Sequence, residues 1–143
     1  MNTTRDGTTL ALAALAVLQI LHLLDELRTD ATADLAEIVL RPQPILGVGG
    51  TVAALVAVRR GARAGRPLAL GVAGLVALGF VLSHGIPVET ARTEPYWGDG
   101  SADAIQWLGV TLILACCAAV GVLAWGRRPA AKDRPPAGLG TAS

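Results

Sequence analysis

The sequence predicts an all-α membrane protein, a bundle of four transmembrane helices with both termini in the cytoplasm. Three observations predict it. Hydrophobic residues make up 52% of the 143 residues and the mean hydropathy is +0.53. Charged residues make up only 16%, against about 25% in a typical soluble domain. Apolar runs recur, and the basic residues gather in alternate segments between them, as in multi-pass membrane proteins. We expect one transmembrane domain over residues 1–126.

The first helix is predicted over residues 8–28. Its run from Leu10 to Leu18 is wholly apolar, and about 20 residues rising ~1.5 Å each cross the ~30 Å hydrocarbon core. Its last quarter is polar. The connection that follows, residues 29–42, places Asp34, Glu37 and Arg41 on one helical stripe, which favours a short amphipathic turn at the membrane interface.

The second and third helices are predicted over residues 44–60 and 67–86. Pro44 suits a first helical position, and both helices are rich in Gly and Ala. Small residues let helices approach closely in lipid. A short basic turn joins the two, and the third helix is expected to stop at Gly85 and Pro87.

The fourth helix is predicted over residues 104–126, with Ser101 or Asp99 as its cap. Trp107 and Trp125 lie about 27 Å apart along such a helix, so we expect one at each membrane interface. The tail, residues 127–143, is rich in Pro, Ala and Gly, which predicts a disordered cytoplasmic segment.

Basic residues predict the orientation, because they collect on the cytoplasmic side. Nine lie at one end of the predicted bundle and three, Arg28, Arg41 and Arg92, at the other. This bias predicts a plasma-membrane protein with both termini inside, and the abundance of Ala, Gly, Arg and Val is typical of GC-rich bacterial genomes. The expected partners are the lipid bilayer and, through the Gly- and Ala-rich helix faces, a second membrane protein or another copy of the chain.

Several function classes are excluded. A net charge of +1 with basic residues only in short turns argues against binding nucleic acid. The sequence has no P-loop, no dinucleotide-binding glycine motif, no nucleophile elbow and no HExxH zinc motif. Cys116 and Cys117 are adjacent within an apolar run, where they act as small hydrophobic residues.

Polar residues inside the predicted helices mark the candidate site. His22, Asp25 and Glu26 follow Gln19 at the end of the first helix. At about 100° per residue these four side chains share a stripe about 120° wide. His84, the only other histidine, ends the third helix. Both helices run outward, so both histidines are expected in the outer leaflet at similar depth.

The run His22-Leu23-Leu24-Asp25-Glu26 resembles the His-x-x-Glu-Glu motif of the small multi-pass membrane proteins called the HXXEE family. Asp25 stands where the family has its first Glu. The resemblance covers five residues together with general size and hydropathy. It implies a membrane protein with a His–carboxylate cluster, and it implies no substrate because the family's function is not established.

Three interpretations of this cluster remain open. The favoured one is a structural or partner subunit, in which His22, Asp25 and Glu26 join helices and Arg28 or Arg92 is the counter-ion. In the second, His22, Glu26 or Asp25, and His84 bind a divalent metal such as Zn or Fe, with Glu89 or Asp99 completing the shell, and hydrolyse a lipid or small molecule at the outer face. The third is metal-free acid–base catalysis or proton-linked transport by the same residues.

Overall fold

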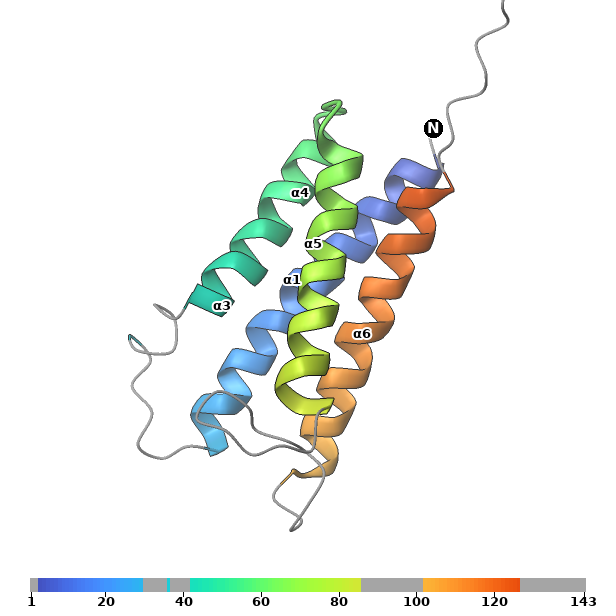
Figure 1. The fold of residues 1–143 in the computed structure, drawn as a ribbon. Helices are drawn as coiled ribbons and strands as arrows, with labels where there is room; N and C mark the ends of the chain where they lie inside the picture. The colour runs from blue at the N-terminus through green and yellow to red at the C-terminus, as the bar shows by residue number, and fades with distance from the viewer. Residues whose placement is uncertain (1–2, 30–35, 37–41, 86–101, 127–143) are drawn as a thin grey trace, which may run out of the picture.

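The computed structural model describes residues 3–29, 36, 42–85 and 102–126, and this part of the chain is helical with no strand. The all-α prediction is therefore confirmed for the described residues. Figure 1 shows the elements in order along the chain. They are α1 (Thr3–Thr29), α3 (Pro42–Pro44), η1 (Ile45–Gly49), α4 (Gly50–Arg59), α5 (Gly65–Phe80), η2 (Val81–Gly85) and α6 (Ala104–Trp125), where η1 and η2 are single π-helical turns.

Three of the helical segments are long and apolar enough to cross a membrane: Arg5–Arg28, Gly65–Gly85 and Ala104–Trp125. The segment predicted as a fourth span, 44–60, is helical, but its apolar part Ile45–Arg59 is shorter. The 5 residues of η1 and 10 of α4 rise about 22 Å together, less than the ~30 Å hydrocarbon core.

The helices form a ring in which each packs mainly against two neighbours. α1 packs against α4 and α6, and α5 packs against the same two helices. Neighbouring helices run in opposite directions (Figure 1). The start of α1, the α4–α5 turn and the end of α6 therefore meet at one end, which we call the basic end. The end of α1, η2 and the start of α6 meet at the other, the histidine end.

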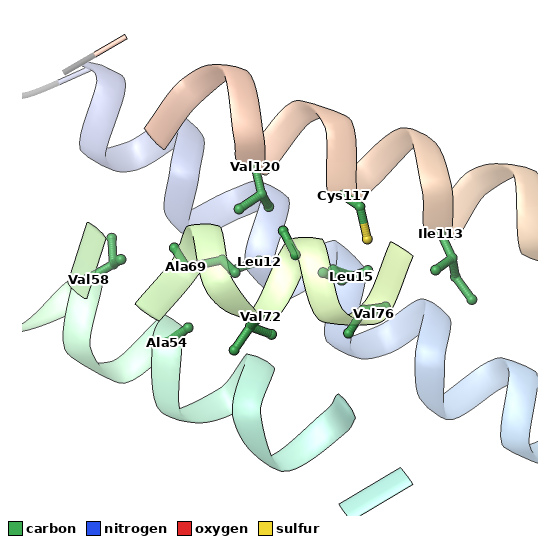
Figure 2. Packing of buried hydrophobic residues seen from close by; sticks show 11 residues of the cluster. Leu12, Leu15, Ala54, Val58, Ala69, Val72, Val76, Ile113, Cys117 and Val120 are labelled. Atoms are coloured by element: carbon green, nitrogen blue, oxygen red, sulfur yellow. The ribbon is translucent and has the colours of Figure 1, made fainter. Parts of the chain in front are cut away.

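The core of the ring is built from small and branched aliphatic side chains. Figure 2 shows these side chains converging from α1, α4, α5 and α6. The cluster comprises Leu12, Leu15, Ala54, Val58, Ala69, Val72, Ala73, Val76, Ile113, Cys117 and Val120. Because three of these residues are alanines, the helix backbones approach closely, as packing in lipid requires.

Large apolar side chains also cover the outside of the helices. The exposed ones include Leu10, Val17, Leu21, Leu24, Val52, Val56, Leu75, Leu78, Leu112 and Val122. They lie on every long helix and face away from the core. An apolar surface of this extent is unfavourable in water and suits contact with lipid.

The start of α6 corrects one sequence prediction. Its N-cap is Asp103, not Ser101 or Asp99. The Asp103 carboxylate accepts from the backbone N–H groups of Ile105 and Gln106, while the Gln106 side chain accepts from the Asp103 N–H at 2.8 Å. This reciprocal capping box is encoded by the spacing Asp103-x-x-Gln106, so the sequence itself carries the signal for the start of α6.

Some sequence predictions lie outside the described residues. They concern the interfacial turn with Asp34, Glu37 and Arg41, the loop with Glu89, Arg92 and Asp99, and the tail 127–143.

Candidate functional site

The polar stripe of α1 turns inward at the histidine end. His22 is 9% exposed, and its Nε2 lies 3.5 Å from Glu26 Oε1, one helical turn further on. The Glu26 side chain is 31% exposed. The i, i+4 spacing places both groups on one face, so α1 presents a buried imidazole with a carboxylate at its more exposed side.

η2 brings the second histidine to the first. The ring centroids of His22 and His84 lie 5.4 Å apart and the two planes are almost perpendicular, at 82°. His84 is also 9% exposed. Two residues 62 positions apart in sequence are thus in ring contact, in agreement with the expectation that they lie at similar depth.

Phe80 completes a cluster of three rings. Its centroid lies 4.9 Å from that of His22 and 5.5 Å from that of His84. Phe80 precedes His84 by one turn on the same helical segment, so both rings face α1. Tilted aromatic packing at these distances stabilises by about 0.5–1.5 kcal/mol per pair beyond the area buried. Phe80 is the only phenylalanine in the chain, and its i, i+4 spacing from His84 is the sequence signal that places it on the same helix face.

Asp25 takes part in a different interaction from Glu26. Its Oδ1 accepts from Arg28 Nε at 2.8 Å, and Arg28 Nη2 reaches Asp103 Oδ2 at 2.7 Å. Arg28 therefore bridges the end of α1 to the N-cap of α6. Of the two counter-ions considered from the sequence, Arg28 is the one that the structure describes.

A second buried polar group lies deeper in the bundle. Gln19, 5% exposed, donates from Nε2 to Thr51 Oγ1 at 2.9 Å and to Leu15 O at 3.3 Å. Thr51 in turn donates to Gly47 O at 2.7 Å. These bonds tie α1 to η1 and α4. A helix predicted from its small residues alone gives no sign that Thr51 is the hydrogen-bond partner of Gln19.

Metal-ligand geometry is not found in the described ranges. Within residues 3–29, 36, 42–85 and 102–126, no group of three or more His, Cys, Asp or Glu side chains is arranged to hold a metal ion. Glu89 and Asp99, proposed as additional ligands, lie outside these ranges. Binding of Zn or Fe by His22, Glu26 and His84 therefore stays a prediction. Metal analysis of the purified protein and of its His84→Gln variant tests it.

Comparison with known protein families, curated proteins and solved structures finds no match for this chain.

Proposed function

We propose that this chain is a multi-pass membrane protein that acts as a structural or partner subunit, with its His–carboxylate cluster joining helices in the outer leaflet. The observation that carries the proposal is the ring contact between His22 of α1 and His84 of η2. Both side chains are buried, and they connect elements far apart in sequence. Polar and aromatic contacts of this kind hold helices together in lipid, where apolar burial contributes little to association.

In this proposal the protein crosses the plasma membrane four times and both termini are cytoplasmic. The basic end then faces the cytoplasm, in keeping with the distribution of Lys and Arg. The short segment Ile45–Arg59 spans by locally thinning the bilayer and by extending Arg59 to the interface. The spacing His22-x-x-Asp25-Glu26 supports membership of the HXXEE family.

Partner contact is supported by the outer face of α5. Gly71, Gly74 and Gly79 are exposed, and the space where a Cβ atom would stand on each is open. A helix with such positions presents its backbone to a neighbour in the membrane, which is how small-residue faces promote helix association.

A double-mutant cycle tests the linking role. The variants are His22→Ala, His84→Ala and the double substitution, and the readout is the free energy of unfolding in mixed micelles. A coupling energy of about 0.5–1.5 kcal/mol is expected for two rings in contact. His22→Ala combined with Leu112→Ala, on the exposed face of α6, is the control and is expected to be additive within about 0.5 kcal/mol. Additivity in both pairs contradicts the proposal.

A second candidate function, acid–base chemistry or proton-linked transport at the outer face, is favoured by one observation. The titratable groups form a continuous series, from the partly exposed Glu26 through His22 to the buried His84. A carboxylate and an imidazole at this spacing can exchange a proton. Glu26→Gln distinguishes the two functions in protein reconstituted into liposomes with an imposed pH gradient. Loss of proton flux with unchanged thermal stability supports proton transfer, and a lower stability without any change in flux supports the structural role.

A further inference from the structure

The basic end contains a pocket of about 110 Å³, at the opposite end of the bundle from the His22–His84 cluster. Its lining residues come from the start of α1, the end of α4, the α4–α5 turn, the start of α5 and the end of α6. Arg5 and Thr8 of α1, Ala62 of the turn, Arg66 of α5 and Ala124 of α6 are among its lining residues. A cavity needs about 10–15 Å³ of such volume to hold one water molecule, so a pocket of about 110 Å³ admits a phosphate-sized group.

Two arginines are held in place at this pocket by backbone carbonyls. Arg5 Nε donates to Val58 O at 3.1 Å, and within the described residues this is the acceptor of the Arg5 side chain. Its Nη1 and Nη2 lie near Gly61, 3.7 and 3.8 Å from where a Cβ atom would stand. Gly61 has a φ of +68°, which favours glycine and lets the turn fold back over α1. Arg66 Nη2 donates to Trp125 O at 3.1 Å.

The charge around the pocket is strongly positive. Arg5, Arg59, Arg60, Arg63 and Arg66 all lie at the basic end. Among the described residues, Asp6 is the one acidic residue at this end, and it does not line the pocket. Arginine presents several N–H donors in a fork that matches the oxygens of a phosphate.

We propose that this pocket binds the phosphate of an anionic lipid headgroup from the leaflet that borders the basic end. The proposal rests on the membrane placement proposed above. A basic pocket between transmembrane helices at the cytoplasmic side is a recurring kind of lipid headgroup site.

An exposed aromatic residue beside the pocket favours a lipid over a free phosphate ion. The backbone oxygen of Trp125 accepts from Arg66 Nη2 at 3.1 Å, and the Trp125 side chain is exposed. An acyl chain attached to a bound headgroup would lie against this side chain, whereas inorganic phosphate has no apolar part that could contact it.

The test measures the thermal unfolding of the full chain in neutral detergent micelles with added lipid. Phosphatidylglycerol is expected to raise Tm in a saturable manner, because a ligand that binds the folded state stabilises it. Phosphatidylcholine and inorganic phosphate at the same concentration are expected to give a much smaller rise. Equal rises with phosphatidylglycerol and phosphatidylcholine overturn the proposal, and full competition by inorganic phosphate assigns the pocket to the free ion instead.

Two matched variants locate the site. Ala62→Glu introduces a carboxylate into the pocket and keeps both arginine–carbonyl bonds, whereas Arg5→Gln removes the bond to Val58 and risks unfolding. Ala62→Glu is expected to weaken phosphatidylglycerol binding at least about tenfold, the effect of losing one charge-assisted interaction. Ala64→Glu adds the same charge to the same exposed turn outside the pocket and is expected to change binding by less than about threefold, the weaker effect of a screened surface charge. Equal weakening by both variants overturns the proposal.

Incorporation into vesicles separates this proposal from the proposed membrane placement. A chain that inserts into phosphatidylcholine vesicles but shows no preference for phosphatidylglycerol contradicts only the headgroup site. A chain that stays in the aqueous phase with vesicles of either lipid contradicts the membrane placement itself.

Discussion

Gln19 shows how a single residue connects the polar and apolar parts of this bundle. A buried amide requires hydrogen-bond partners, and Gln19 finds one in the hydroxyl of Thr51 on a different helix. Gly47 leaves the room for it, because a Cβ atom at that position would stand 2.7 Å from Gln19 Oε1. The glycine, the threonine and the glutamine therefore form one unit across α1, η1 and α4.

Replacing Thr51 by Val removes the hydroxyl and keeps the shape of the side chain. We expect this variant to lower the free energy of unfolding by about 1 kcal/mol, because Gln19 loses a buried partner. Thr111→Val is the matched control, since Thr111 is exposed and, among the described residues, its hydroxyl donates to Trp107 O of its own helix. The free energy of unfolding of both variants is measured in mixed micelles. An equal decrease in the two variants contradicts the role of Thr51 as the partner of Gln19.

The two glycines of η1 offer a second comparison. Gly47→Ala forces the flexible end of Gln19 away from Thr51, whereas Gly49→Ala meets open space. Both variants gain the same helix propensity, so their difference reports the hydrogen bond. We expect Gly47→Ala to be less stable than Gly49→Ala by about 1 kcal/mol. Equal stability of the two variants would show that the Gln19 side chain moves aside without losing its hydrogen bond to Thr51.

The start of α6 is fixed partly by a contact from another helix. Asp103 caps it through two backbone N–H groups and also pairs with Arg28, the last basic residue of α1. Hydrogen bonds from Gln106 and then from Arg28 hold the pKa of the Asp103 carboxyl below its ordinary value. The same carboxylate thus begins one helix and attaches it to the end of another.

This depressed pKa predicts a dependence of stability on pH. The unfolded carboxyl has a pKa of about 3.9, so the stabilisation is fully present above about pH 4 and is lost as pH falls through the lower folded pKa. Thermal unfolding from pH 7 to pH 2 measures it. Asn caps helices as well as Asp but carries no charge, so Asp103→Asn is expected to flatten this acid-induced decrease in Tm. At neutral pH it is expected to keep more stability than Asp103→Ala. Identical profiles of Tm against pH for wild type and Asp103→Asn would contradict the assignment of the acid-induced decrease to Asp103.

At the scale of the whole molecule, the ring of helices has apolar residues both inside and outside. The inner ones are small or branched and interlock, while the outer ones are exposed along the full length of the helices. Polar groups are concentrated at the two ends, with arginines at one and the His22–His84 cluster and its acidic neighbours at the other. This distribution is the reason to expect that the basic end faces the cytoplasm.

Thiol labelling in intact cells tests that orientation. In a background where Cys116 and Cys117 are replaced by Ala, a cysteine at Gly98 is expected to react with a membrane-impermeant reagent added outside. A cysteine at Ala64, in the exposed α4–α5 turn, is expected to react only after the membrane is permeabilised. The reverse pattern would invert the proposed topology.

Helix positions were predictable from the sequence because apolar runs and breakers act locally. The predicted ranges 67–86 and 104–126 lie within two residues of the observed ends of Gly65–Gly85 and Ala104–Trp125. α1 begins at Thr3, whereas the predicted start was residue 8. The prediction started too late because the first turn of α1 is polar and so shows no apolar pattern. The π-helical turns η1 and η2 were not predictable, since an extra residue in a turn leaves no mark on hydropathy.

The sequence by itself determined the helical class, the apolar surface and the candidate residues, because these follow from residue type and spacing along one chain. The tertiary structure alone decided which of those residues meet. It brought His84 and Phe80 against His22, paired Arg28 with Asp103, and joined Gln19 to Thr51. These contacts depend on how helices rotate and cross, and that depends on side-chain packing between segments far apart in sequence.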